Sequence, residues 1–174
     1  MKIFIDAGYY RGKAMEYYAP FLDDSWTIYA FEPNINLPVE ESLSRFPFNV
    51  EWIKKAAWTE NGKKEFVLTA RNDASHLSAV RAGVDETITV PTMDFSKFIA
   101  DLPEDATICV SMDIEGSEYP VLRKMIKEGT IKKINLLDIE FHHRLIPGED
   151  DDSSSRLRQE VESLGTLVKL KLDI

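Results

Sequence analysis

Short apolar runs alternate with segments of helical periodicity along the chain, and turn residues separate them. This alternation is typical of an α/β fold with a mostly parallel central sheet and helices on both faces. Strands are expected at residues 2–7, 26–31, 50–58, 64–69, 87–92, 107–112, 133–141 and 167–172. Helices are expected at residues 13–21, 39–46, 94–100, 118–128 and 156–164. No internal repeat or second domain is visible, so we expect one domain over residues 1–174.

Two turn and strand signals predict how the middle of the chain pairs. Asn61-Gly62 is the strongest hairpin signal and predicts that residues 64–69 fold back on the strand ending at Trp58. Pro91 has no N–H to give to a strand ladder, which indicates an edge position for residues 87–92.

Two polar stretches are expected to form loops. Residues 72–82 are irregular and include Ser75, His76 and Ser78; they could form a substrate loop, although His76 also suits an ordinary loop. Residues 147–155 are acidic and predict a solvated, flexible loop. A Ca²⁺ loop is the alternative, although the EF-hand spacing and its closing Glu are missing.

Composition narrows the function classes. The chain has 174 residues, of which 44% are hydrophobic and 29% charged, as in an ordinary globular protein. Its net charge of −9 argues against binding to nucleic acid, because phosphate contacts need clustered Lys and Arg. Cys109 is the only cysteine and suits a buried core position in a reducing compartment. No stretch approaches the ~20 apolar residues of a membrane span and no signal peptide is visible, so we expect a cytoplasmic protein.

Acidic residues stand at the ends of three expected core strands. Asp6 follows Phe4-Ile5, Glu32 follows the run that ends at Phe31, and Asp113 follows Met112. Because the carboxyl ends of parallel strands meet at one edge of a sheet, these acids are expected to form a single site. Glu115 and Glu118 are expected to orient the turn at the start of the next helix.

The first strand leads into the pattern Asp6-x-Gly8-x-x-x-Gly12. Glycines let the backbone approach a ligand closely, and the following helix offers free N–H groups, although a plain strand-to-helix turn would also use glycine. The spacing differs from GxGxxG, which disfavours an NAD-linked oxidoreductase. Glu32, roughly 20 residues further on, lies where ribose hydroxyls are held in Rossmann-like sites, or it is a solvated acid.

Glu140 and His142 stand at the end of the seventh expected strand, and their i, i+2 spacing would place both on one face of it. Together with Asp113 they are the candidate catalytic residues. Asp113 or His142 could accept a proton directly, or Asp113, Glu140 and His142 could bind Mg²⁺ or Mn²⁺. We favour the metal-free arrangement because no tight ligand spacing is visible.

These motifs together resemble the FkbM-type methyltransferases, a branch of the S-adenosylmethionine-dependent Rossmann-like enzymes. The stretches that carry the resemblance are Phe4-Ile5-Asp6-Ala7-Gly8 with Gly12, Phe31-Glu32-Pro33-Asn34, Lys55-Ala56-Ala57-Trp58, Met112-Asp113-Ile114-Glu115-Gly116-Ser117-Glu118 and Leu137-Asp138-Ile139-Glu140-Phe141-His142. The resemblance implies a Rossmann-like methyltransferase sandwich that uses S-adenosyl-L-methionine to methylate a hydroxyl of a sugar, glycan or polyketide-type product.

The resemblance also implies residue roles. Asp6, Gly8 and Gly12 would line the methionine part of the cofactor, Glu32 would hold the ribose diol, Ala56 and Ala57 would lie near the adenine, and Asp113 would lie near the transferred methyl group. Tyr9 and Tyr10 stand where the family usually has Ala-Asn, so Tyr10 and Arg11 are added to the candidate cofactor contacts, with Arg11 as a partner for the cofactor carboxylate.

The expected partner is a small-molecule or oligosaccharide acceptor. Because of the resemblance to the family, we choose a deoxyhexose such as rhamnose as the expected acceptor. Tyr9, Tyr10, Trp58 and Tyr119 could stack on a sugar ring or serve as packing residues. A domain excised from a larger enzyme, for example one with glycosyltransferase domains, is also expected from how closely both termini adjoin core strands. The alternative function is a non-catalytic nucleoside-binding module of a larger glycan-processing protein.

Overall fold

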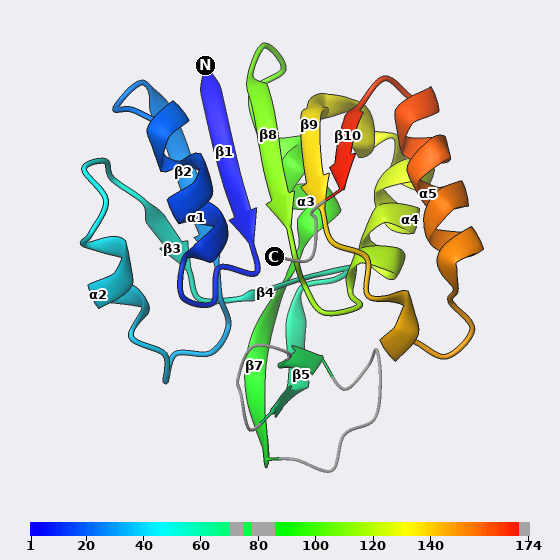
Figure 1. Ribbon diagram of the computed structural model, residues 1–174, viewed down its shortest axis with the longest axis horizontal. Helices are drawn as coiled ribbons and strands as arrows, with labels where there is room; N and C mark the ends of the chain where they lie inside the picture. Colours follow the sequence, from blue (N-terminus) through cyan, green and yellow to red (C-terminus); the bar gives the residue numbers. More distant parts are fainter. Residues whose placement is uncertain (70–74, 78–85, 171–174) are drawn as a thin grey trace.

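The computed structural model describes residues 1–69, 75–77 and 86–170, which form two sheets (Figure 1). The larger sheet has the order β10-β9-β8-β1-β2-β3, and each of its pairings is parallel. Its strands are β1 (Lys2–Ala7), β2 (Trp26–Phe31), β3 (Glu51–Ile53), β8 (Thr107–Met112), β9 (Ile134–Ile139) and β10 (Leu167–Leu170). The expected parallel central sheet is confirmed.

Helices cover both faces of this sheet, as expected. They are α1 (Lys13–Tyr18), α2 (Val39–Leu43), α3 (Phe95–Asp101), α4 (Glu118–Glu128) and α5 (Asp151–Ser163), with short 3-10 turns η1 (Ala19–Phe21), η2 (Thr130–Lys133) and η3 (His143–Leu145). Alternation along β1 separates two cores: Ile3 and Ile5 pack with residues of α3, α4 and α5, whereas Phe4 packs with residues of α1 and α2. No helix in the described ranges is long and apolar enough to cross a membrane.

The smaller sheet lies beyond the carboxyl ends of the parallel strands (Figure 1). Its order is β4-β7-β5-β6, with β4 (Ala56–Trp58), β5 (Gly62–Leu68), β6 (His76–Leu77) and β7 (Glu86–Asp94). The prediction that residues 54–58 continue the third strand is therefore wrong, because β3 ends at Ile53 and the chain crosses into the other sheet.

The predicted hairpin at Asn61-Gly62 is also wrong, because β7 lies between β4 and β5. The turn is bonded to β7 itself: the Asp94 N–H donates to Asn61 Oδ1 at 3.1 Å, and the Thr92 hydroxyl donates to the Glu60 carbonyl at 2.9 Å. Hydrogen bonds to residues of β7 that lie 32 and 33 positions further along the chain, rather than a local turn preference, therefore decide the pairing.

Pro91 lies in the interior strand β7, contrary to its predicted edge position. The parallel pairing with β4 begins only at Thr92, whereas on the other side Pro91 lies opposite Lys63 of β5. Pro91 therefore lies outside the part of β7 that has β4 on one side and β5 on the other. Its missing N–H removes no hydrogen bond to β4.

The acidic segment 147–155 is only partly a loop, because α5 begins at Asp151 rather than at residue 156. Asp150 caps the helix: its Oδ1 accepts from the Ser153 N–H at 2.7 Å, and the Ser153 hydroxyl accepts from the Asp150 N–H at 2.8 Å. Asp151 and Asp152 then occupy the first turn, where the helix dipole favours negative charge. The polar stretch 72–82 lies outside the described residues except for residues 75–77, and there the predicted loop is wrong, because His76 and Leu77 are buried in β6 and pair with β5.

The tips of β1 and β8 are joined by a close backbone contact. The Asp113 N–H donates to the Ala7 carbonyl at 2.9 Å, and Gly8 follows with a φ of 92°. A Cβ atom on Gly8 would lie 1.7 Å from the Asp113 carbonyl oxygen, so only glycine fits. This contact sets the spacing between the glycine turn and the acidic tip of β8.

We expect Gly8→Ala to reduce the free energy of unfolding by on the order of 3 kcal/mol more than Gly129→Ala does. Gly129 also has positive φ, but a Cβ there meets nothing within 4 Å, so it reports the cost of the backbone conformation alone, about 1 kcal/mol. Urea unfolding followed by tryptophan fluorescence measures both variants. Equal losses of unfolding free energy in the two variants would show that the backbone at Gly8 and Asp113 can shift to accommodate a Cβ atom at little cost.

Candidate functional site

A cavity of about 720 Å³ lies at the carboxyl edge of the parallel sheet, and residues at or just after the ends of β1, β2, β8, β9 and β10 line it. The sequence-predicted residues that line it are Gly8, Tyr10, Glu32, Ala56, Ala57, Asp113 and Glu140. Asp6, Arg11, Gly12 and His142 are not among the lining residues. The structure thus brings most of the predicted cofactor and acidic residues to one cavity, and places the other four around it.

The two phenols after Gly8 have different surroundings. Tyr9 is buried with 1% exposure, and its hydroxyl is 2.8 Å from the Ser42 hydroxyl of α2, so it is a core residue whose pKa burial raises. Tyr10 has a φ of 50° and lines the cavity. The exposed Arg11 guanidinium lies 5.2 Å from the centre of the Tyr10 ring.

Asp6 and Gly12 lie on either side of the turn and are both buried. Asp6 is fully buried and lies level with Ser111 of β8 in the strand register. Gly12 has a φ of 84°, and a Cβ there would lie 2.5 Å from the Tyr9 hydroxyl oxygen. Trp58 and Tyr119 are buried as well, at 8% and 0% exposure, so packing accounts for them rather than an open stacking surface.

Glu32 is held firmly at the tip of β2. Its carboxylate accepts from the backbone N–H of Tyr10 at 2.9 Å and from that of Asn34 at 2.7 Å, and Trp52 Nε1 donates to its carbonyl at 3.0 Å. Burial raises the pKa of Glu32 to about 7, although the two N–H groups act in the opposite direction. A fixed carboxylate in the cavity wall still has lone pairs for ligand hydroxyl groups.

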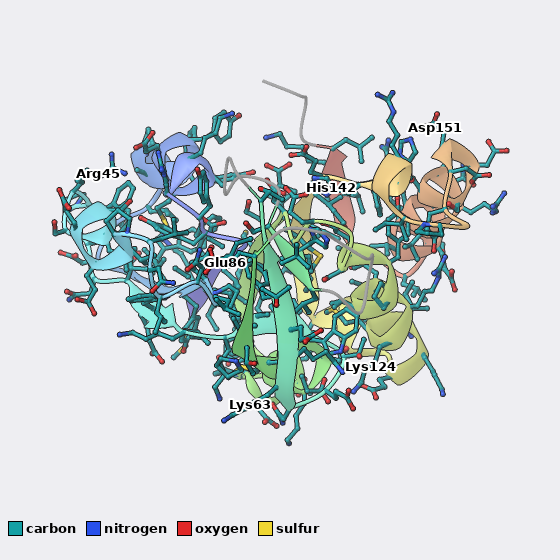
Figure 2. All side chains as sticks on the ribbon, turned by 90° about the horizontal axis from the view of Figure 1, so that it is seen from below. Arg45, Lys63, Glu86, Lys124, His142 and Asp151 are labelled. Atoms are coloured by element: carbon teal, nitrogen blue, oxygen red, sulfur yellow. The ribbon has the colours of Figure 1, made fainter. Side chains whose placement is uncertain are left out.

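The other side of the cavity is acidic and surrounds His142. Its Nε2 lies 3.7 Å from Asp113, 3.7 Å from Glu115 and 3.6 Å from Glu140, while its Nδ1 lies 3.1 Å from Glu118. The His142 side chain is only 12% exposed. Figure 2 shows His142 near the ends of the parallel strands, inward of Asp151.

Glu118 anchors this group. It is fully buried and accepts from the backbone N–H of Ile114 at 2.8 Å and from that of Gly116 at 2.7 Å. These bonds confirm the prediction that Glu118 orients the turn. Burial lowers the pKa of His142, but the hydrogen bond to Glu118 and the charges of Glu118, Glu115 and Asp113 outweigh it and raise the pKa to about 9.

Glu140 and His142 meet for a different reason from the one predicted. β9 ends at Ile139, so strand alternation does not extend to either residue, and His142 has a φ of −99° and a ψ of 44°. The Glu140 N–H donates to the Met112 carbonyl at 3.0 Å, which holds the chain beside β8 as it turns.

Among the residues that the structure describes, Asp113, Glu115 and His142 could hold a metal ion, since their ligand atoms all lie within 4.8 Å of one another. Two carboxylates and an imidazole suit a divalent cation such as Mn²⁺. Glu115, which the sequence analysis assigned only to the turn, has a φ of 53° that directs it towards this group.

Sequence reasoning missed one end of the cavity, which we name the tyrosine arm: Tyr17, Tyr18, Asp138, Lys169 and Leu170. Asp138 is buried, accepts a short hydrogen bond from the Tyr18 hydroxyl, and accepts from Lys169 Nζ at 3.2 Å. The available signal was an acid inside an otherwise apolar strand, two residues before Glu140.

The parallel sheet, the glycine turn after β1 and the acids at the strand tips together define a Rossmann-like domain with its site at the carboxyl edge of the sheet. More narrowly, the methyltransferase FkbM domain matches residues 6–168, and the chain belongs to this family. The resemblance seen in the motifs is thereby confirmed over nearly the whole chain. No curated protein and no solved structure gave a significant match.

The raised pKa of His142 predicts a pH-dependent contribution to stability. Because the folded-state pKa is about 9 and the ordinary value is 6.5, the contribution is complete below pH 6.5 and is lost as the pH rises through 9. We expect His142→Gln to be less stable than the wild type by about 3 kcal/mol at pH 6 and nearly equal to it at pH 10. Urea unfolding in buffer with EDTA measures the difference; a difference independent of pH would contradict a charged His142.

Proposed function

We propose that the protein transfers a methyl group from S-adenosyl-L-methionine to a hydroxyl group of a sugar or glycan. The observation that carries this proposal is a single cavity bordered by Gly8 and Glu32 on one side and by Asp113 and Glu140 on the other. Membership of the FkbM methyltransferase family supports the reaction class. The cofactor and the acceptor class are inferred from the residues around the cavity.

The cofactor side has features that suit an adenine nucleoside. Ala56 and Ala57 of β4, with Phe66 and Leu77 of the smaller sheet, give an apolar wall for a flat base. Glu32 would accept hydrogen bonds from the ribose diol, and the turn at Gly8 would lie against the amino-acid part, with Asp6 and Gly12 on either side of the turn. When bound, S-adenosylmethionine supplies an electrophilic methyl group on a sulfonium.

The acidic side would handle the hydroxyl proton. Asp113 and Glu140 line the cavity, whereas His142 does not and its raised pKa keeps it protonated at neutral pH. We therefore assign proton acceptance to Asp113, with Glu140 beside it, and make His142 a positioning residue that holds these carboxylates through its charge.

The metal arrangement remains the alternative for this side. Asp113, Glu115 and His142 would hold the ion, which replaces Glu140 of the predicted set by Glu115. A bound divalent cation would lower the pKa of an acceptor hydroxyl. His142 Nε2 would have to release its proton to serve as a ligand, so protonation and metal binding compete.

The acceptor is expected to be neutral. The chain carries a net charge of −9, and three carboxylates lie within 4 Å of His142 Nε2 near the cavity, so an anionic acceptor would be repelled. A neutral saccharide, with a deoxyhexose such as rhamnose as the first choice, fits this balance.

The proposal is tested by incubating the protein with labelled S-adenosylmethionine and a panel of mono- and oligosaccharides, with and without EDTA. Transfer to a sugar hydroxyl supports it, and loss of transfer in EDTA selects the metal arrangement. Thermal shifts with S-adenosylmethionine, S-adenosylhomocysteine and NAD accompany the assay. No shift with either sulfur compound would contradict the proposal, and a shift without transfer would favour a nucleoside-binding module.

Asp113→Asn is expected to lower kcat by about 10²-fold or more, because the variant loses the proton acceptor, while the Kd of S-adenosylhomocysteine changes little. Asp105→Asn, in an exposed turn far from the cavity, is the matched control and should retain full turnover. If the variant bound the cofactor more weakly but kept a normal kcat, Asp113 would be a cofactor-binding residue rather than the proton acceptor.

The pKa of about 7 for Glu32 predicts that nucleoside binding depends on pH. A protonated carboxyl loses an acceptor position, so we expect the Kd of S-adenosylhomocysteine to rise as the pH falls from 8 to 6. Calorimetry at both pH values measures this, and Glu32→Gln, which cannot ionise, should bind more weakly with a flat profile. Equal pH dependence in the wild type and the variant would exclude Glu32 as its source.

A further inference from the structure

The tyrosine arm has features that the proposed cofactor and proton-handling residues do not use. It lies on the face of the larger sheet that carries α1, and it belongs to the same cavity as Asp113 and Glu140. Asp138 precedes Glu140 by two residues, so the arm begins directly beside the acidic strand tips.

Asp138 has one oxygen available for a ligand. The residue is 3% exposed, and its Oδ2 accepts from Tyr18 and Lys169. Its Oδ1 makes no hydrogen bond with any part of the chain that the structure describes, and the hydroxyl of Ser111, level with it on β8, makes none either. Because buried polar atoms are rarely left unpaired, this position calls for a hydroxyl group or water.

Lys169 lies over Asp138 and is partly exposed to solvent. Its side chain is 45% exposed, and its Nζ lies 4.5 Å from the centre of the Tyr17 ring. An exposed ammonium on a flexible stem can shift to admit a hydroxyl and then donate to a neighbouring one. The charges of Lys169 and Asp138 offset one another, which suits a neutral ligand rather than an ion.

Tyr17 offers an aromatic ring that is partly exposed to solvent. It is 55% exposed, in contrast to Tyr18, whose ring is 5.0 Å away in an edge-to-face arrangement and whose hydroxyl turns inward to Asp138. An exposed ring beside a carboxylate and an ammonium can contact the apolar face of a sugar while the polar groups reach its hydroxyls.

We propose that the tyrosine arm is the binding site for the acceptor, which stacks as a neutral pyranose ring on Tyr17, donates one hydroxyl to Asp138 and accepts from Lys169 through a neighbouring hydroxyl. This inference rests on the proposed methyl transfer to a sugar and names the residues that would select it. The ring would then lie next to Glu140 and Asp113, with a further hydroxyl directed to them.

The test measures the binding of methyl α-L-rhamnopyranoside and methyl α-D-glucopyranoside to the full chain by saturation-transfer NMR, with and without S-adenosylhomocysteine. We expect at least one glycoside to bind, and Tyr17→Ala to raise its Kd about fivefold or more through loss of the ring contact. Tyr17→Phe keeps the ring and is the matched control, with an expected change below about twofold. Asp138→Asn should raise the Kd about tenfold or more.

Calorimetry with S-adenosylhomocysteine on the same variants separates the acceptor from the cofactor. Unchanged affinity for S-adenosylhomocysteine in Tyr17→Ala and Asp138→Asn supports the inference. A higher Kd for S-adenosylhomocysteine in these variants, with unchanged glycoside binding, would overturn it and would show that the tyrosine arm binds the amino-acid end of the cofactor. Absence of binding by both glycosides would also overturn it. Failure of S-adenosylhomocysteine to bind would contradict the proposed function. The glycoside titration without S-adenosylhomocysteine would still show whether the tyrosine arm binds a sugar.

Discussion

The contact between Gly8 and the Asp113 carbonyl is the constraint on which the site depends. It joins the turn after β1 to the tip of β8 at a distance that excludes any side chain on Gly8. The turn is tied on its other side to β2, where the Gly8 and Tyr9 N–H groups donate to the Phe31 carbonyl at 3.1 and 2.9 Å. The proposed cofactor side and the acidic side are therefore one backbone unit, and neither can shift without the other.

The parallel sheet and the residues at its tips were predictable because their signals are local. An apolar run such as residues 107–112 must be covered on both faces, and strands of this kind are joined by helices that bring their carboxyl ends together. Glu32 and Asp113 could thus be assigned to one site without knowledge of any contact. The glycine turn was equally local, since the positive φ values of Gly8 and Gly12 belong to the turn itself.

The errors arose where contacts between distant residues decide the structure. The turn at Asn61-Gly62 has a hairpin sequence, yet hydrogen bonds to β7 place another strand in between. Tyr9 and Tyr10 are the same residue type in adjacent positions and both border the cavity, but the hydroxyl of Ser42, from α2, holds the Tyr9 side chain in the core. Asp138 stood out only as an acid in a strand, because its contacts are with Tyr18 and Lys169, which lie 120 and 31 residues away in sequence.

The acidic edge also explains why a histidine lies behind the cavity rather than in it. Carboxylates of Asp113, Glu115 and Glu140 converge within 4 Å of one nitrogen, and in a partly buried place such like charges repel one another unless a cation lies between them. Protonated His142 supplies that cation, and Glu118 fixes the ring from its other nitrogen, so Nε2 must point at the acids. A metal ion would use the same nitrogen and the same space. The edge therefore requires a positive charge at this position in either arrangement, and this charge holds together the carboxylates that face the cavity.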